Sequence, residues 1–391
     1  MKGTIVNLLD VVSITAKQVD PRLDQFADMP LIAPDHIESE SGRILAFESA
    51  RQQEAISGKY LVEPQDVIYS KIRPYLMKAA IPGQAVLCSA DMYPLKCSDR
   101  IVPEFLHQLL LSHEFTQFAI SCSNRTGIPK INREELAQFR FHLPSVADQR
   151  KVARIAKTSG ETVELARQLK ESQLHRKQGL MQHLLTGHKR LTGFKGSWKP
   201  QRLSSFLTRV TRKNVDSCTR ALTVSAQRGL VEQGSYFAKQ MAAEDNEHYL
   251  LIKHGEFAYN RSAAAGYPFG AIKRLDRFDE GIVSTLCLCF GITDTAQTDT
   301  DFLTAVFEGG LLNRQLRAIA HEGARSHGLL NVTSTDFFKL RLNMPPPGEQ
   351  AAIAEVLNAA DQALQLQQQK LVALQQQKRA LMQQLLAGDH P

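Results

Sequence analysis

The chain repeats part of itself, and this repeat constrains its fold more than any other feature. Residues 144–187 match residues 345–388 without a gap, at a constant offset of 201. The match is clearest at its end, where LMQHLLTG in the first copy corresponds to LMQQLLAG in the second. A gapless correspondence of this length indicates a duplicated structural unit.

The repeated segments are predicted to be long helices that pair with each other. In the second copy, apolar residues follow alternating steps of three and four, which is the pattern of a coiled-coil seam. A proline precedes each segment, and Gly187 and Gly388 close them. Ser159-Gly160 predicts a break, leaving a helix from Glu161 to Thr186 that is about 39 Å long. Each helix enters from its own globule, so we expect antiparallel pairing; two independent surface helices are the alternative.

The chain therefore divides into two globules and two helical segments. These segments are residues 1–144, 145–190, 191–344 and 345–391. Alternating apolar runs predict strands at 66–70, 85–88, 139–143, 257–260, 282–290 and 339–342, and helical patterns occur at 103–121 and 300–321. We predict a mixed α/β (α+β) fold in which the two helices pair as an antiparallel coiled coil and the chain has internal pseudo-two-fold symmetry.

Composition excludes several classes of protein. Hydrophobic residues make up 43% of the 391 residues, enough for two cores and too many for intrinsic disorder. The longest apolar runs are too short to span a membrane, and the N-terminus lacks a signal peptide, so we expect a cytoplasmic protein. The six cysteines form no CxxC pair, which favours small buried side chains in a reducing compartment.

The positive charge is unevenly distributed. The formal net charge is +7, and the four segments carry −2, +6, +4 and −1 in chain order. The excess lies on the first repeat helix and on the second globule. A basic balance of this kind suits a nucleic-acid partner, although it is weak evidence by itself.

Motifs for catalysis are absent from the sequence. There is no Asp/Glu-x-Lys triplet of a metal-dependent nuclease, no GxG for a methyl-donor loop and no Walker phosphate loop. HExxH and GxSxG are also missing. We therefore expect a chain that is not an enzyme and holds no cofactor or metal.

Two unlike globules, each followed by a helix ending LMQxLLxG, resemble the specificity subunit of type I restriction–modification systems. The resemblance also includes DVIYSKIRP at 66–74, the segment 144–149, GEFAY at 255–259 and GAIKRL at 270–275. WKPQRL at 198–203 matches the start of a family domain. The first globule departs from this pattern, because it has no tryptophan and begins almost at its first strand.

The resemblance implies a non-catalytic reader of double-stranded DNA. Each globule would be a target recognition domain for one half of a bipartite, asymmetric site. The helices would set the half-site spacing and dock two methyltransferase (modification) subunits, which ATP-dependent restriction subunits join in phage defence. S-adenosylmethionine, ATP and Mg are then expected on those partners. The alternative is a two-reader nucleic-acid-binding scaffold outside restriction.

Two groups of residues are candidate DNA contacts, since their side chains can bind phosphates or base edges. The first is the loop before the last strand of each globule, with Asn124, Arg125, Thr126, Lys130, Asn132 and Arg133, and with Arg325, Ser326, His327 and Asn331. The second follows an upstream strand, with Lys71, Arg73 and Lys78, and with Asn260, Arg261, Lys273 and Arg274. A solvated turn and strand-edge charges are the respective alternatives.

The candidate residues for docking the partner lie on the repeat helices. They are Arg176, Lys177, Lys378 and Arg379. The alternative interpretation is that these side chains are solvated flanks of the heptad seam.

Overall fold

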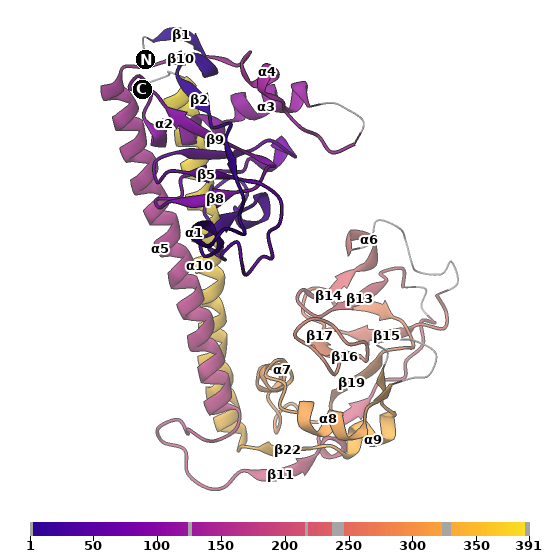
Figure 1. Cartoon of the computed structure of the whole chain (residues 1–391). Coiled ribbons are helices and arrows are strands. Elements are labelled where there is room, and N and C mark those ends of the chain that lie inside the picture. The colour runs from indigo at the N-terminus through magenta and orange to yellow at the C-terminus, as the bar shows by residue number, and fades with distance from the viewer. Residues whose placement is uncertain (1–2, 124–126, 216–217, 237–245, 323–329, 388–391) are drawn as a thin grey trace. The chain divides into compact units, whose positions relative to one another are not determined.

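The computed structural model describes residues 3–123, 127–215, 218–236, 246–322 and 330–387. Figure 1 shows its helices and strands in chain order. The chain divides into two compact units. Unit 1 comprises Met1–Arg167 and Gln369–Pro391, and unit 2 comprises Gln168–Gln368. Each unit therefore contains one globule and parts of both long helices.

The two long helices are α5 (Val146–Leu184) and α10 (Pro347–Ala387). The predicted break at Ser159-Gly160 is wrong, because α5 runs through both residues. The Ser159 hydroxyl donates to the carbonyl oxygen of Ile155 at 2.8 Å, which keeps the side chain within the helix. Gly187, with φ of +72°, lies just beyond α5 and donates its N–H to the carbonyl oxygen of Leu184.

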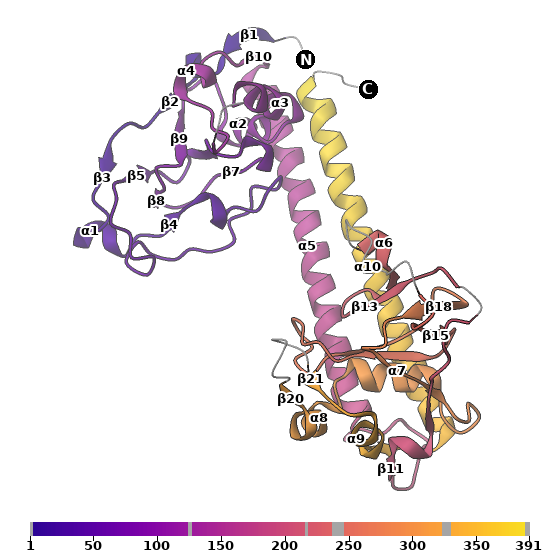
Figure 2. The ribbon, with the colours of Figure 1, turned by 90° about the vertical axis from the view of Figure 1, so that its right-hand side faces the viewer.

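The long helices are antiparallel in each unit. In unit 1, Val152 near the start of α5 shares a hydrophobic core with Met382 near the end of α10. In unit 2, Leu184 at the end of α5 shares a core with Leu357 near the start of α10. Figure 2 shows the two helices side by side. The predicted antiparallel pairing is thereby confirmed.

Each unit is built around an antiparallel sheet of four strands in an equivalent order, β2-β9-β6-β7 in unit 1 and β12-β19-β16-β17 in unit 2. The strands of unit 1 are β2 (Val12–Ile14), β9 (Met92–Cys97), β6 (Val67–Ser70) and β7 (Ala79–Ala80). Those of unit 2 are β12 (Leu207–Arg209), β19 (Leu288–Ile292), β16 (Phe257–Asn260) and β17 (Ala271–Arg274). The duplication therefore extends into the globules, where the sequences have diverged.

A short antiparallel pair leads into each long helix. In unit 1, β1 (Thr4–Asn7) pairs with β10 (Arg140–Leu143). In unit 2, β11 (Lys199–Arg202) pairs with β22 (Arg341–Met344). The long helix begins shortly after the last strand ends in both units, so the position of this strand fixes where the helix begins.

The remaining elements differ between the units. Unit 1 adds a sheet of β3 (Gln18–Val19), β5 (Lys59–Val62), β8 (Val86–Cys88) and β4 (Leu31–Ile32), and the helices α1 (Asp24–Ala27), α2 (Pro103–Leu110), α3 (His113–Cys122) and α4 (Arg133–Leu136). Unit 2 adds the pairs β13 (Leu222–Ser225) with β14 (Gly229–Glu232), β15 (Leu250–Lys253) with β18 (Glu280–Val283), and β20 (His321–Glu322) with β21 (Leu330–Asn331). Its helices are α6 (Gln233–Tyr236), α7 (Thr300–Glu308), α8 (Asn313–Ile319) and α9 (Ser334–Lys339).

Three predicted elements are split in two. The predicted strand 282–290 becomes β18 and β19, because a turn closed by the Cys287 N–H and the Ser284 carbonyl interrupts it. The predicted helix 103–121 becomes α2 and α3, because Ser112 caps α3 by accepting from the N–H of Phe115. The predicted helix 300–321 becomes α7 and α8, with Gly309-Gly310 between them.

A buried glutamine holds the start of each long helix. In unit 1, Gln149 accepts from the N–H of Val102 at 2.8 Å and donates to the carbonyls of Arg100 and Pro144 at 2.9 Å. In unit 2, Gln350 accepts from the N–H of Asp299 at 2.9 Å and donates to two carbonyls, those of Gln297 at 3.2 Å and Pro345 at 2.9 Å. The repeat retains this glutamine because it satisfies buried backbone groups at the strand–helix junction.

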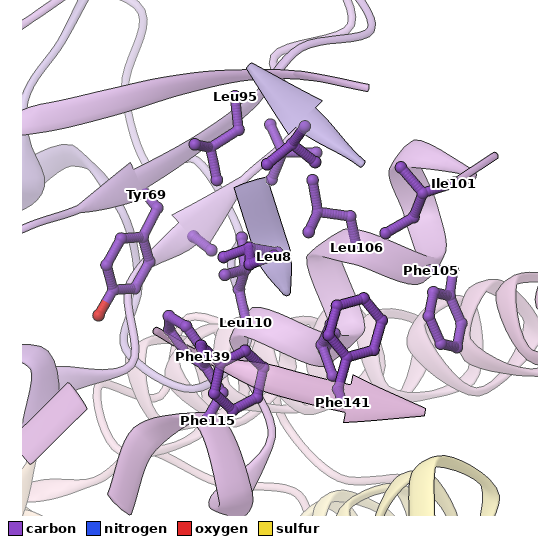
Figure 3. Close-up of a cluster of buried hydrophobic side chains, with 14 of the residues drawn as sticks. Leu8, Tyr69, Leu95, Ile101, Phe105, Leu106, Leu110, Phe115, Phe139 and Phe141 are labelled. Carbon is purple, nitrogen blue, oxygen red and sulfur yellow. The ribbon is translucent and has the colours of Figure 1, made fainter. Parts of the chain in front are cut away.

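Aromatic side chains fill the cores. Figure 3 shows the cluster of unit 1, in which Tyr69 and Phe139 both meet Phe115 edge-to-face, with ring centroids 5.2 and 4.9 Å apart. In unit 2, Tyr259 occupies the equivalent strand and stacks on Phe337 at 5.4 Å.

All six cysteines are free, and burial raises the pKa of the Cys88 thiol to about 12, which keeps it protonated.

Candidate nucleic-acid interface

Unit 1 brings its two candidate groups together. The residues that follow β6 pair with the segment before α4: Ile72 bridges to Lys130, and the N–H of Ile131 donates to the carbonyl of Lys71 at 2.9 Å. Arg73 has a φ of +49° and donates its N–H to the carbonyl of Pro129 at 2.8 Å. Two segments that are far apart in sequence therefore form one surface.

Two of these basic side chains lie over one aromatic ring. The Lys71 ammonium lies 5.5 Å from the centroid of the Tyr93 ring, and the Arg133 guanidinium lies 5.9 Å from it. The Tyr93 hydroxyl donates to the carbonyl of Ile131 at 3.3 Å, which fixes the ring in place. Partial burial, with the neighbouring charge of Lys130 as the next cause, lowers the pKa of Lys71. We call Lys71, Arg73, Lys130 and Arg133 the basic cluster.

The basic cluster is available to a ligand. Arg73, Lys130 and Arg133 are exposed, and Lys71 is partly exposed. Within the part of the chain that the structure describes, no carboxylate forms an ion pair with any of the four. Such a group of unneutralised cations attracts a polyanion, and the long arginine and lysine side chains suit phosphate oxygens.

Two other candidates in unit 1 have structural roles instead. The Lys78 ammonium donates to the carbonyl of Pro34 at 2.7 Å. Asn132 caps α4, since its side chain accepts from the N–H of Glu135 at 2.8 Å and its own N–H donates to the Glu135 carboxylate. Both side chains are thus engaged within unit 1, and their assignment as DNA contacts stays a prediction. Asn124, Arg125 and Thr126 lie outside the described residues.

In unit 2, most of the equivalent candidates form ion pairs or hydrogen bonds with other residues of the unit. Lys273 is buried, forms an ion pair with Glu308 and donates to the Tyr267 hydroxyl at 3.1 Å. Arg274 forms ion pairs with Asp276 and with Asp301, the latter at 2.5 Å. The charges of these two candidates are therefore neutralised within the unit, and their assignment as DNA contacts stays a prediction.

Arg261 is also held by the protein. Its guanidinium donates to the carbonyl of Val332 at 3.0 Å and to that of Leu286 at 2.7 Å, so it fixes the loop next to β21. The Asn260 side chain accepts from the N–H of Ser262 at 3.0 Å. Asn331 is exposed on β21 and is free to contact a ligand. Arg325, Ser326 and His327 lie outside the described residues.

The docking candidates on the helices also have different environments. Arg176 is exposed, whereas Lys177 of α5 forms an ion pair with Asp361 of α10. Lys378 is the repeat equivalent of Lys177, but in unit 1 its ammonium faces Gly160, 3.5 Å from where a Cβ would lie. Burial lowers the pKa of Lys378. Lys177 is therefore a contact between the two helices, and its role in docking stays a prediction.

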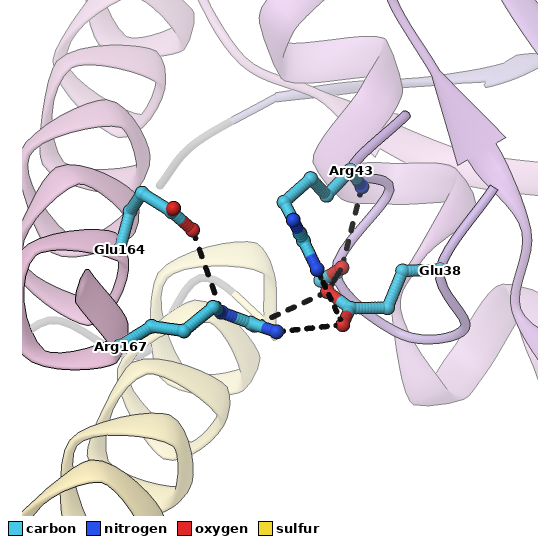
Figure 4. A network of polar contacts seen from close by, with 5 residues as sticks. Glu38, Arg43, Glu164 and Arg167 are labelled. Carbon is cyan, nitrogen blue, oxygen red and sulfur yellow. Dashed lines mark hydrogen bonds and ion pairs between the residues drawn. The ribbon is translucent and has the colours of Figure 1, made fainter. Parts of the chain in front are cut away.

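Arg379 belongs to a set of contacts that join the globule of unit 1 to its helices. It forms an ion pair with Glu40 at 3.0 Å. Nearby, Arg167 of α5 donates to Glu38 at 2.8 and 3.2 Å, and Arg43 also donates to Glu38 (Figure 4). Partial burial alone would raise the pKa of Glu38, but the hydrogen bonds from these groups lower it to about 2.

Sequence reasoning missed Tyr93 and the carboxylates that neutralise unit 2. Tyr93 lies in β9, where the apolar pattern concealed its position beside the basic cluster. Glu308 and Asp301 lie on α7, about thirty residues after the lysine and arginine that they bind. No local pattern in the sequence links these positions, because the pairing depends on how α7 packs against β17.

Residues 4–173 match the family described as the type I restriction modification DNA specificity domain. This region, which is less than half of the chain, is therefore similar to type I DNA specificity domains. A stretch of 146 residues is 35% identical to the type I restriction enzyme EcoDI specificity subunit of Escherichia coli. That match covers 34% of this chain and 32% of the relative, so it spans about a third of the relative's length. These matches confirm the family resemblance predicted from the sequence.

Solved structures extend the similarity in fold to the whole chain. The HsdS subunit from Thermoanaerobacter tengcongensis is 17% identical, with a TM-score of 0.51 over 100% of this chain and 97% of that one. A chain from a study of complex assembly and conformational transition of the type I R-M system is 17% identical, with a TM-score of 0.60 over 99% and 98%. The S subunit from M. genitalium is 10% identical, with a TM-score of 0.55 over 98% and 96%. At these identities the likeness shows the fold, and it confirms the predicted α/β architecture.

The described residues contain neither a membrane span nor a cluster of metal ligands. No helix there is both long enough and apolar enough to cross a membrane. Within the same residues, no group of three or more histidine, cysteine, aspartate or glutamate side chains is arranged to hold a metal ion.

Proposed function

We propose that this chain is the DNA-reading specificity subunit of a type I restriction–modification complex. Each globule reads one half of a bipartite DNA target, and because the globules differ in sequence the target is asymmetric. The family match of residues 4–173 and the duplicated fold support this proposal. Two linked readers gain affinity over one, since binding of the first raises the effective concentration of the second.

The observation that carries the proposal is the basic cluster of unit 1. Its exposed cations have no carboxylate partner among the described residues, and they lie beside Tyr93 on a surface that is fixed by backbone hydrogen bonds. Phosphate contacts from such a surface would position the domain on the duplex. Side chains of the adjacent loop would then reach the base edges that distinguish sequences.

The long helices are proposed to set the half-site spacing and to dock two modification subunits, one for each copy of the repeat. Both helices continue without a break past the residues where the compact units meet in sequence. A continuous helix is a stiff spacer, and a duplicated framework offers equivalent surfaces to two copies of one partner. The chemistry would then belong to those partners, which would carry S-adenosylmethionine, while restriction subunits would use ATP and Mg.

Genome-wide mapping of methylated bases tests the proposal. A host would express this chain together with the modification subunit of the same system, and a matched host would lack only this chain. We expect a bipartite, asymmetric methylated motif that disappears when the chain is absent. Methylation that is unchanged by the deletion would contradict the proposed function.

A further inference from the structure

A cavity in unit 2 lies where the end of α5 meets the loop that follows it. It has a volume of about 330 Å³. It is lined by Arg176, Gly179, Leu180, His183, Leu184, Lys189, Arg190, Leu191 and Val356. The N–H of Lys189 donates to the carbonyl of His183 at 3.1 Å, so the loop folds back over the last turn of the helix and closes one side of the cavity.

The cavity combines a basic rim with an apolar floor. Arg176, His183 and Lys189 are exposed, and no acidic side chain is among the lining residues. Only Arg190 is neutralised, since it forms an ion pair with the buried carboxylate of Glu349. Leu184 is buried in the core of unit 2, and the leucines at 180 and 191 pack against that core.

The ordinary role of basic residues at a helix end explains only part of this arrangement. Basic side chains are favoured in the last turn of a helix, where the helix dipole attracts positive charge, and His183 stands in the last turn of α5. Arg176 lies two turns before the end of α5, where the dipole effect has faded. Its position on the rim is therefore unexplained by the helix itself.

The repeat shows that the basic rim is specific to unit 2. The equivalents of Leu180 and Leu184 in the second copy are Leu381 and Leu385, so the apolar floor is retained. In contrast, Gln377 stands in place of Arg176, and Gln384 stands in place of His183. The first copy thus has a basic side chain at two positions where the second copy has glutamine, on a framework that both copies share.

We infer that this cavity binds a segment of the modification subunit that carries an acidic side chain next to an apolar one. The inference rests on the proposed function and adds to it the chemistry of one docking point. The exposed cations of Arg176 and Lys189 have no acidic side chain beside them in the cavity and so attract an anion, and the apolar floor favours a protein side chain over a DNA phosphate. The copy of the partner bound at unit 2 therefore has an anchor, weakened by salt, that the copy at unit 1 lacks.

Substitutions taken from the sibling copy test this inference without introducing foreign residues. Arg176→Gln with His183→Gln gives the cavity of unit 2 the side chains found at positions 377 and 384. We expect one of the two binding events with the modification subunit to weaken by about tenfold at low ionic strength, and by less as salt rises. Isothermal titration of the full chain with that subunit, supported by native mass spectrometry of the assembly, measures both events.

A reciprocal variant and a control complete the experiment. Gln377→Arg with Gln384→His should strengthen the weaker event and increase its salt dependence. Arg202→Gln with Lys213→Gln, which removes exposed charge from unit 2 outside the cavity, should leave both events unchanged.

Each contrary outcome has its own meaning. Equal binding by wild type and both sibling variants would overturn the inference while leaving the proposed function intact. Loss of DNA affinity with unchanged assembly would also overturn it, since the cavity would then face DNA. Failure of the wild-type chain to bind the modification subunit at all would contradict the proposed function.

Discussion

Units 1 and 2 hold the start of a long helix in the same way, yet they place charges against the helices differently. Gln149 and Gln350 each bind one backbone N–H and two carbonyls. Across the helix pair, Lys177 of unit 2 has Asp361 as its partner, whereas the equivalent lysine of unit 1 faces Gly160. Both copies keep the glutamine, because buried backbone groups need its hydrogen bonds. The copies differ in the partner of the lysine, because a partly exposed ion pair contributes little to stability.

The largest effect is expected from removing either glutamine. Gln149→Leu and Gln350→Leu each leave one N–H and two carbonyls without a partner in a buried position. Since each unsatisfied group costs about 1–3 kcal/mol, we expect each variant to lower the free energy of unfolding of its unit by about 3 kcal/mol or more. Hydrogen exchange of the full chain would locate the loss to one unit.

The matched control is Gln376→Leu, which changes an exposed glutamine of α10 and should have little effect. Similar losses from Gln149→Leu and Gln350→Leu would support the equivalence of the two junctions. A loss in only one of the two variants would contradict the equivalence of the two junctions.

A smaller, one-sided effect is expected at the residue just before each glutamine. Glu349 is fully buried and accepts from Arg190 and from the Trp198 indole, the latter at 3.1 Å. Its repeat equivalent, Asp148, is partly exposed and pairs with Lys151. Glu349→Gln should lower the free energy of unfolding of unit 2 by about 2 kcal/mol, because it leaves the arginine without its carboxylate.

Asp148→Asn should change the free energy of unfolding of unit 1 by less than about 0.5 kcal/mol, since its ion pair is exposed to solvent. Thermal and denaturant unfolding of both variants measure the difference. Equal effects would contradict the assignment of Glu349 as a buried anchor that unit 1 lacks.

An effect smaller than that of Glu349→Gln is expected from exchanging the residues across the helix pair. Asp361→Gly should destabilise unit 2 by about 1 kcal/mol, because it removes the ion pair with Lys177 and puts glycine in a helix. Gly160→Asp should stabilise unit 1 by a similar amount, since it gives Lys378 a partner. Gly160→Ala separates the contribution of helix propensity from that of the ion pair with Lys378, because alanine favours the helix and carries no charge. A stabilisation by aspartate no greater than that by alanine would show that no ion pair forms.

The framework of the fold could be predicted because it repeats. The gapless match of 144–187 with 345–388 located both helices and their antiparallel partners, and alternation located β6, β10 and β16. The break expected at Ser159-Gly160 did not occur. The preference of serine and glycine for non-helical backbone is weak there. Helical hydrogen bonds and packing against α10 outweigh it.

The candidate site could be predicted only in part. Sequence placed Lys71, Lys130 and Arg133 in two separate groups, and the structure brings them to one surface through backbone pairing at Ile72. The same reasoning could not distinguish them from Lys273 and Arg274, whose charges are neutralised by carboxylates on α7. Charge type is local information, whereas neutralisation depends on tertiary contacts.

The measurement that tests the account most directly is the salt dependence of DNA binding by the assembled complex. Lys130→Gln with Arg133→Gln would be compared with the wild type and with Lys17→Gln/Arg100→Gln, which removes equal exposed charge from unit 1. If the basic cluster contacts phosphates, the first variant should bind its target at least about fivefold more weakly, with a salt slope smaller by about 1 for each cation removed. An unchanged affinity and slope in a folded, fully assembled complex would contradict the assignment of the cluster as the DNA-binding surface of unit 1.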